Sequence, residues 1–195
     1  MALFRLASES MISPGVSVKI VDESNLEVSQ GELGEIIVKG PNVADGYLNE
    51  PLLNLERFTD GWFHTGDIGF KDEDGYIYFK GRKDDIINVG GEKVSPLEIE
   101  NIILGAKIGM KDFCVVGIPD EEGIYGNVPV ICTTENISLK YDLQKINDLL
   151  RSAGLKNTFL LRKLFYIEQI PRTPNGKVLR KQIIEHLTNL NQSEK

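Results

Sequence analysis

The sequence predicts an α+β fold, in which a small β-rich subdomain is followed by a small α+β domain with a central sheet flanked by helices. Apolar and polar residues alternate as in strands at several places within residues 15–80, and helical spacing of apolar residues appears after residue 95. A charged run, Gly81-Arg82-Lys83-Asp84-Asp85, separates the two patterns. The expected divisions are a β-rich subdomain over 1–82, an α+β domain over 83–190 and a disordered tail over 191–195.

The β-rich subdomain is predicted from two alternating segments. Residues 15–40 alternate on both sides of the turn-rich segment 29–34, which predicts two strands. A hairpin is predicted over 70–79, because Asp74-Gly75 is a favoured turn sequence and the flanking residues alternate.

The second domain begins with a strand predicted over 86–89, which runs into Gly90-Gly91. A helix is predicted to start after Ser95, which can cap it. Pro96 suits the first helical position, and Glu98 can complete a capping box.

The remaining elements alternate between strands and helices, as expected for a sheet with helices packed on it. In order, the expected elements are strands over 113–118 and 128–133, a helix carrying Leu143, Ile146 and Leu150, a strand over 164–167, a loop over 171–177, and a last helix carrying Leu179, Ile183, Leu187 and Leu190.

Composition limits the classes of function. The formal net charge is −7, and an acidic surface repels phosphate backbones, so nucleic acid is not an expected partner. No apolar run approaches the roughly 18 residues of a membrane-spanning helix, and the first residues lack the apolar core of a signal peptide. We therefore expect a cytoplasmic protein with no transmembrane segment.

The cysteines and histidines do not suggest a reactive or metal-binding site. Cys114 and Cys132 lie in apolar stretches without C-x-x-C spacing, and we expect buried, reduced thiols. His64 and His186 have too few suitable partners for a metal site or a Ser-His-Asp triad, and His64 is expected to be a turn residue. No metal ligand is predicted.

Three ordered motifs indicate the function. The first comprises Gly31-Glu32-Leu33-Gly34-Glu35-Ile36, Gly46-Tyr47-Leu48 and Trp62-Phe63-His64-Thr65-Gly66-Asp67. The second comprises Gly81-Arg82-Lys83-Asp84-Asp85, Gly90-Gly91-Glu92 and Glu98-Ile99-Glu100, and the third is Pro171-Arg172-Thr173-Pro174-Asn175-Gly176-Lys177. In this order and spacing they resemble the adenylate-forming superfamily, which includes acyl-CoA synthetases, peptide-synthetase adenylation domains and firefly luciferase. The resemblance covers residues 15–188 and is nearest to AMP-forming acyl-CoA synthetases.

The resemblance implies that Asp67 and Arg82 hold the ribose of ATP. A carboxylate presented by a Thr-Gly turn can accept hydrogen bonds from two vicinal hydroxyls, and such charge-assisted bonds are strong. The alternatives are that Asp67 only caps a turn and that Arg82 is only a surface arginine.

The same resemblance makes Asp84 a hinge whose backbone torsions change as the second domain swings. It also places Gly90 and Gly91 along the pantetheine arm of coenzyme A, where glycines allow close approach to the backbone. The alternatives are a solvated charge at Asp84 and a simple turn at Gly90-Gly91.

Lys177 is the predicted catalytic residue. During adenylation a carboxylate attacks the α-phosphate of ATP, and one ammonium group can neutralise and align both partners. The family's catalytic lysine occupies this position. The alternative is an ordinary charge next to a helix end. The segment is not a P-loop, because it lacks the first glycine and the following Ser or Thr.

The sequence also departs from the family pattern. It does not contain the Ser/Thr/Gly-rich loop that wraps the triphosphate or the Thr-Glu motif that supports Mg²⁺, and in relatives both precede the matching region. Residue 127 is Asn where many relatives carry Glu, with no catalytic consequence expected. The resemblance therefore implies a C-terminal piece that is inactive alone, with 1–82 forming the end of a large N-terminal domain.

The implied reaction of the parent enzyme converts a small carboxylic acid and ATP to acyl-AMP, and then forms a thioester with coenzyme A. The expected cofactors are ATP, coenzyme A and Mg²⁺, the last held by the part outside this chain. Two alternatives stay open: an amino-acid or acyl adenylation domain that loads a carrier protein, and a non-catalytic binding relative.

Overall fold

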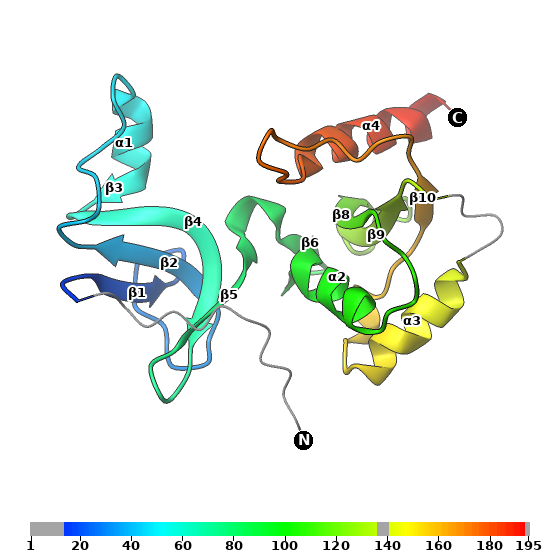
Figure 1. The fold of residues 1–195 in the computed structure, drawn as a ribbon, viewed down its shortest axis with the longest axis horizontal. Coiled ribbons are helices and arrows are strands. Elements are labelled where there is room, and N and C mark those ends of the chain that lie inside the picture. The colour runs from blue at the N-terminus through cyan, green and yellow to red at the C-terminus, as the bar shows by residue number, and fades with distance from the viewer. Residues whose placement is uncertain (1–13, 136–140, 194–195) are drawn as a thin grey trace. The chain divides into compact units, whose positions relative to one another are not determined.

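The computed structural model describes residues 14–135 and 141–193, with the side chains of 190–193 outside the description. The chain forms two compact units, Met1–Asp84 and Asp85–Lys195, which we call the first and second units (Figure 1). Their boundary lies two residues after the one predicted from the charged run. The predicted α+β class is confirmed.

The first unit is built on an antiparallel sheet with the order β1-β2-β4-β3, in which β5 also pairs with β4. In Figure 1, β4 is a long, curved ribbon that pairs with three other strands of the sheet. Its strands are β1 (Ser17–Val21), β2 (Gly34–Lys39), β3 (Phe58–Thr59), β4 (Trp62–Lys71) and β5 (Ile77–Arg82), and its helix is α1 (Pro51–Arg57).

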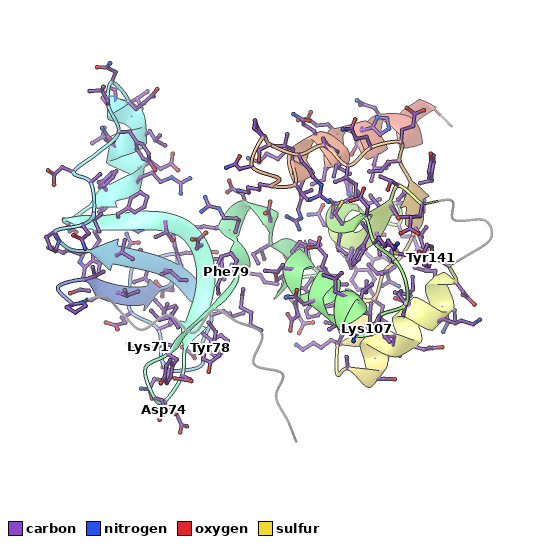
Figure 2. All side chains as sticks on the ribbon, viewed as in Figure 1. Lys71, Asp74, Tyr78, Phe79, Lys107 and Tyr141 are labelled. Carbon is purple, nitrogen blue, oxygen red and sulfur yellow. The ribbon has the colours of Figure 1, made fainter. Side chains whose placement is uncertain are left out.

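The predicted hairpin is formed by β4 and β5. Asp72 closes its turn, because its carboxylate accepts hydrogen bonds from the backbone N–H groups of Asp74 and Tyr76 and from the hydroxyl of Tyr78. Figure 2 labels Asp74 at the tip of this hairpin and Tyr78 on β5. The Tyr78 ring stacks on Phe70 with a centroid distance of 4.8 Å, a cross-strand pair that supports the register.

The second unit contains a two-stranded and a three-stranded sheet, in the orders β6-β7 and β10-β9-β8. Strands β8 and β9 are antiparallel, whereas β10 runs parallel to β9. The elements are β6 (Ile87–Val89), β7 (Glu92–Val94), α2 (Pro96–Gly105), β8 (Phe113–Pro119), β9 (Asn127–Thr133), α3 (Leu143–Ser152), β10 (Leu164–Tyr166) and α4 (Arg180–Ser193), with 3₁₀ turns at Lys83–Asp85 and Asn157–Phe159.

The core of the second unit follows from the alternation of side chains along β8 and β9. Val115 and Ile131 pack on one face with residues of α2 and α3. Cys114 and Cys132 pack on the other face, in a separate apolar cluster that includes residues of α4. Figure 1 shows α4 on the opposite side of the sheet from α2 and α3, which confirms the predicted sheet flanked by helices.

The helix ends differ in detail from the expectations. Pro96 is in the first turn of α2, but the side chain of Ser95 at the N-cap does not make the capping hydrogen bond. α4 begins one residue after Leu179 and extends to Ser193, three residues into the predicted tail; residues 194–195 lie outside the description. None of the described helices combines the length and apolar character that crossing a membrane requires.

Candidate functional site

Asp67 lies on β4 directly after a β-bulge, which corrects the prediction of a Thr-Gly turn. Strand β2 pairs Ile36 with Asp67 but Ile37 with His64, so Thr65 and Gly66 are extra residues on β4. Gly66 has φ of +72°, and an added Cβ there would lie 2.7 Å from a terminal nitrogen of Arg57 and 2.9 Å from one of Arg82. Only glycine therefore fits this bulge without displacing two arginines.

Thr65 holds the bulge in place. Its hydroxyl donates to the Ile36 carbonyl at 2.6 Å and accepts from the Asp67 N–H at 3.0 Å. The position of Asp67 is thereby set by the backbone of β2 as well as by β4.

The structure brings Asp67 and Arg82 together as cross-strand partners of β4 and β5. Nη1 of Arg82 lies 2.7 Å from Oδ1 of Asp67 and also donates to the Thr65 carbonyl at 2.7 Å. The two side chains are 33% and 34% exposed, so solvent reaches the pair. Among the residues that the structure describes, none is hydrogen-bonded to Oδ2 of Asp67, which leaves that oxygen available as an acceptor.

Glu35 is a buried carboxylate beneath this bulge that the sequence analysis did not identify. Its oxygens accept hydrogen bonds from the Gly66 N–H at 3.0 Å and from Nζ of Lys83 at 2.9 Å, and Nδ1 of His64 lies 3.5 Å away. Burial raises the pKa of Glu35, but the hydrogen bonds from Lys83 and Gly66 outweigh burial and lower it. The sequence signal that could have identified Glu35 is a charged residue within a segment that alternates as a strand.

His64 belongs to β4 and not to a turn, which corrects a second prediction. Its side chain is 12% exposed and lies beside Glu35. In the described part of the chain, no group of acidic, histidine or cysteine side chains is arranged to hold a metal ion.

A polar hollow of about 290 Å³ lies beside the bulge within the first unit. Charged side chains dominate its lining, so it suits a polar rather than an apolar ligand. The lining residues include Glu35, Arg57, His64, Gly66, Arg82 and Lys83.

Replacing Glu35 by Gln is expected to destabilise the first unit in a pH-dependent way. The charged hydrogen bonds contribute about 2 kcal/mol at neutral pH. Because folding lowers the pKa of Glu35, this contribution is present above the unfolded value of about 4.5 and is lost as the pH falls toward the folded value. Urea unfolding followed by Trp62 fluorescence measures it, because Trp62 is the one tryptophan and lies on β4.

The control for this variant is Glu73→Gln, which makes the same change at an exposed turn position. The wild-type and Glu35→Gln free energies of unfolding should differ most near neutral pH and converge in acid, whereas Glu73→Gln should follow the wild type throughout. A difference independent of pH would contradict the assigned ionisation of Glu35.

Gly90 and Gly91 form the two-residue turn between β6 and β7. Their φ values are +60° and +88°, which is the pattern of a type I′ turn that favours glycine. The Gly90 N–H donates to the Tyr125 carbonyl at 2.7 Å, and an added Cβ on Gly90 would lie 3.3 Å from the Tyr125 ring. The turn alone thus accounts for both glycines, and their contact with coenzyme A stays a prediction.

Lys177 ends a tight turn before α4. Its N–H donates to the Thr173 hydroxyl at 3.0 Å, and its carbonyl accepts from the Thr173 N–H at 2.8 Å. The residue is exposed, and within 14–135 and 141–193 no side chain or carbonyl pairs with its ammonium group. The turn therefore holds the backbone of Lys177 and leaves its charge available for a ligand.

The two cysteines are cross-strand partners on β8 and β9, and both are fully buried. A hydrogen bond with Cys114 and burial raise the pKa of Cys132 far above its ordinary value. The prediction of buried thiols is confirmed, and a thiol that stays protonated is a poor nucleophile.

The chain is similar to CoA ligases over most of its length. It is 36% identical over 160 residues to a 2-succinylbenzoate–CoA ligase from Listeria monocytogenes, covering 82% of this chain and 33% of that protein. It is 33% identical over 175 residues to an oxalate–CoA ligase from Arabidopsis thaliana, covering 88% and 33% respectively. The chain thus spans about a third of the length of the curated relatives it matches. No protein family model matches it.

A solved structure shares both the sequence and the fold. The o-succinylbenzoate CoA synthetase of Bacillus subtilis, in complex with its acyl-adenylate intermediate, matches with a TM-score of 0.78 and 30% identity. The match covers 87% of this chain and 34% of that one.

Proposed function

The chain belongs to the adenylate-forming superfamily that includes the CoA ligases, and on that premise we propose that it is the C-terminal part of an AMP-forming acyl-CoA synthetase. The complete enzyme would convert a carboxylic acid and ATP to acyl-AMP and pyrophosphate, and then transfer the acyl group to the thiol of coenzyme A. The observation that carries the proposal is the Asp67–Arg82 pair on the β4 bulge.

This pair fits the ribose of ATP. Oδ2 of Asp67 can accept from one hydroxyl while Oδ1, already paired with Arg82, accepts from the neighbouring one. The Arg82 guanidinium orients the carboxylate through its hydrogen bond to Oδ1.

Lys177 serves the first half-reaction. As the carboxylate substrate attacks the α-phosphate, negative charge develops between the two groups, and the ammonium group can bridge both. A lysine suits this role because it is a point charge on a long, flexible stem. Its exposure on a backbone-held turn supports the assignment.

Asp84 serves as the hinge between the half-reactions. It is exposed, lies in the 3₁₀ turn Lys83–Asp85 and is the last residue of the first unit. A change of backbone torsion at Asp84 would move Lys177 out of the active site and bring the Gly90-Gly91 turn into it. The turn would then accommodate the pantetheine arm. The family's Mg²⁺ does not fit the described residues, so we derive no step through it in this chain.

A panel of carboxylic acids supplied to the complete protein with ATP tests this function through pyrophosphate release. Acid-dependent release, followed by thioester formation with free coenzyme A, is the expected result. Acyl-AMP formation without transfer to coenzyme A, together with transfer to a carrier protein, would establish the carrier-loading alternative. Absence of release with every acid would support a non-catalytic relative.

Replacing Asp67 by Ala is expected to weaken the use of ATP whichever acid is supplied. Loss of charged hydrogen bonds to the ribose should lower kcat/KM for ATP by about a hundredfold, because each such bond contributes roughly 1.5–3 kcal/mol. The control is Asp74→Ala, at the tip of the β4–β5 hairpin. A change of less than about threefold in Asp67→Ala would show that Asp67 has only a structural role.

A further inference from the structure

A part-buried charge cluster lies in the second unit at the start of α4. Nη2 of Arg180 donates to both carboxylate oxygens of Glu100 at 2.7 and 3.0 Å. Nη1 lies 3.3 Å from Oδ2 of Asp85, and Nε donates to the Val115 carbonyl at 3.2 Å. All three guanidinium nitrogens are thus paired, and the side chain is only 13% exposed.

This one guanidinium connects Asp85, the last residue of the 3₁₀ turn and the first of the second unit, with α2, β8 and α4. Glu100 strengthens the junction, because its Oε1 also accepts from the Val115 N–H at 2.8 Å. Contacts to Val115, Asp85 and Glu100 come from three different nitrogens, which requires the planar guanidinium of arginine and which lysine cannot reproduce. Glu98-Ile99-Glu100 is part of a sequence motif, and no step of the proposed reaction uses it.

The cluster lies between the proposed hinge and the proposed catalytic lysine. Asp85 is the residue after Asp84, and Arg180 is three residues after Lys177. The Lys177 turn is closed just before Arg180, since Arg172 pairs with Val178 and the Leu179 N–H donates to the Pro171 carbonyl at 2.9 Å. The Arg180 guanidinium therefore provides a direct contact between the residue after the hinge and the segment that carries Lys177.

We propose that Arg180 is a positioning residue. It makes Asp85, the first residue of the second unit, and the Lys177 turn move as one rigid body. Rotation at Asp84 then delivers the ammonium group to the same place in every cycle. Such coupling matters because a displacement of about 1 Å in a reacting constellation costs on the order of a hundredfold in rate. This proposal rests on the roles proposed for Asp84 and Lys177.

Removing Arg180 has two separable consequences. It frees the Lys177 segment from the hinge, and it leaves the Asp85 and Glu100 carboxylates close together without their cation, which destabilises the fold. The double variant Arg180→Met with Glu100→Gln removes the second consequence, because Gln is neutral and still accepts from Val115. Comparing single and double variants distinguishes positioning from stability.

The experiment measures acyl-AMP formation and thermal unfolding in the complete enzyme for Arg180→Met, the double variant and a control, Arg151→Met. Arg151 is the matched control because its guanidinium pairs with Asp148 on the exposed face of α3. We expect kcat to fall about tenfold or more in both Arg180 variants, with KM for ATP changing less than about threefold. Tm should drop in Arg180→Met, recover in the double variant and stay unchanged in the control.

Any of three results would overturn the inference. If kcat recovers together with Tm in the double variant, Arg180 has a structural role only. If kcat is unchanged in Arg180→Met while Lys177→Ala is inactive, Lys177 needs no coupling to the hinge and the proposed function stands alone. If wild type forms no acyl-AMP, or Lys177→Ala forms it at the wild-type rate, the proposed function fails and the inference fails with it.

Discussion

In the complete enzyme, Lys177→Ala is expected to lower the rate of acyl-AMP formation by about a hundredfold or more, which is the typical loss when a preorganised electrostatic contact is removed. The ammonium group is exposed, and no described residue pairs with it, so its charge is available to the developing phosphate charge. Pyrophosphate release under single-turnover conditions measures the effect. The binding of ATP should change much less, because the contact is made in the transition state.

Thioester formation from synthetic acyl-AMP should survive in Lys177→Ala, because in the proposed alternation Lys177 has already rotated away when the thiol displaces AMP. The control is Lys145→Ala, which removes an exposed ammonium group from α3. An equal loss in both half-reactions would show that Lys177 is not specific to adenylation. A loss in Lys145→Ala of similar size would show that the effect reflects overall surface charge.

Asp84→Pro is expected to have the opposite selectivity. Proline fixes φ near −65° and removes the N–H, so a hinge that must change its torsion would be held in one state. If that state is the adenylating one, acyl-AMP still forms, while transfer to coenzyme A falls by about a hundredfold, as expected when the reacting groups are not brought together. Both half-reactions are measured separately, with synthetic acyl-AMP supplied for the second.

Asp84→Ala is the matched control, because it removes the same carboxylate but leaves φ free. Near-normal activity of Asp84→Ala beside a defective Asp84→Pro would assign the effect to backbone torsion. Equal defects in the two variants would assign it to the carboxylate, and equal losses in both half-reactions would contradict alternation between two states.

Local sequence was sufficient for the elements that repeat a pattern over many residues. β8, β9, α3, α4 and the turn of the β4–β5 hairpin lie close to the predicted ranges, because alternation and helical spacing report directly on which face is buried. β4 begins at Trp62, eight residues before the predicted hairpin. The elements that were not predicted are short. α1 has seven residues with none buried, and β3 and β7 have two and three residues, too few to show a period.

The Lys177 turn was also accessible from sequence, because its determinants are neighbours. Gly176 supplies a φ of +84°, and the hydrogen bonds that close the turn join Thr173 to Gly176 and Lys177. Asp67 was identified as a site residue for its motif, but its setting was predicted wrongly. A Thr-Gly-Asp segment is compatible with both a turn and a bulge, and the choice depends on the partner strand.

The sequence by itself determined the α+β class, the order of the main strands and helices, and the residues to examine for function, because these follow from periodicity and from local motifs. Only the tertiary structure decided the β4 bulge, the buried Glu35 beneath it and the Arg180 cluster. Each depends on pairing between distant residues: 31 positions separate Glu35 from Gly66, and 95 separate Asp85 from Arg180. Such contacts exist only once sheet register and helix packing have brought the partners together, and no local pattern encodes them.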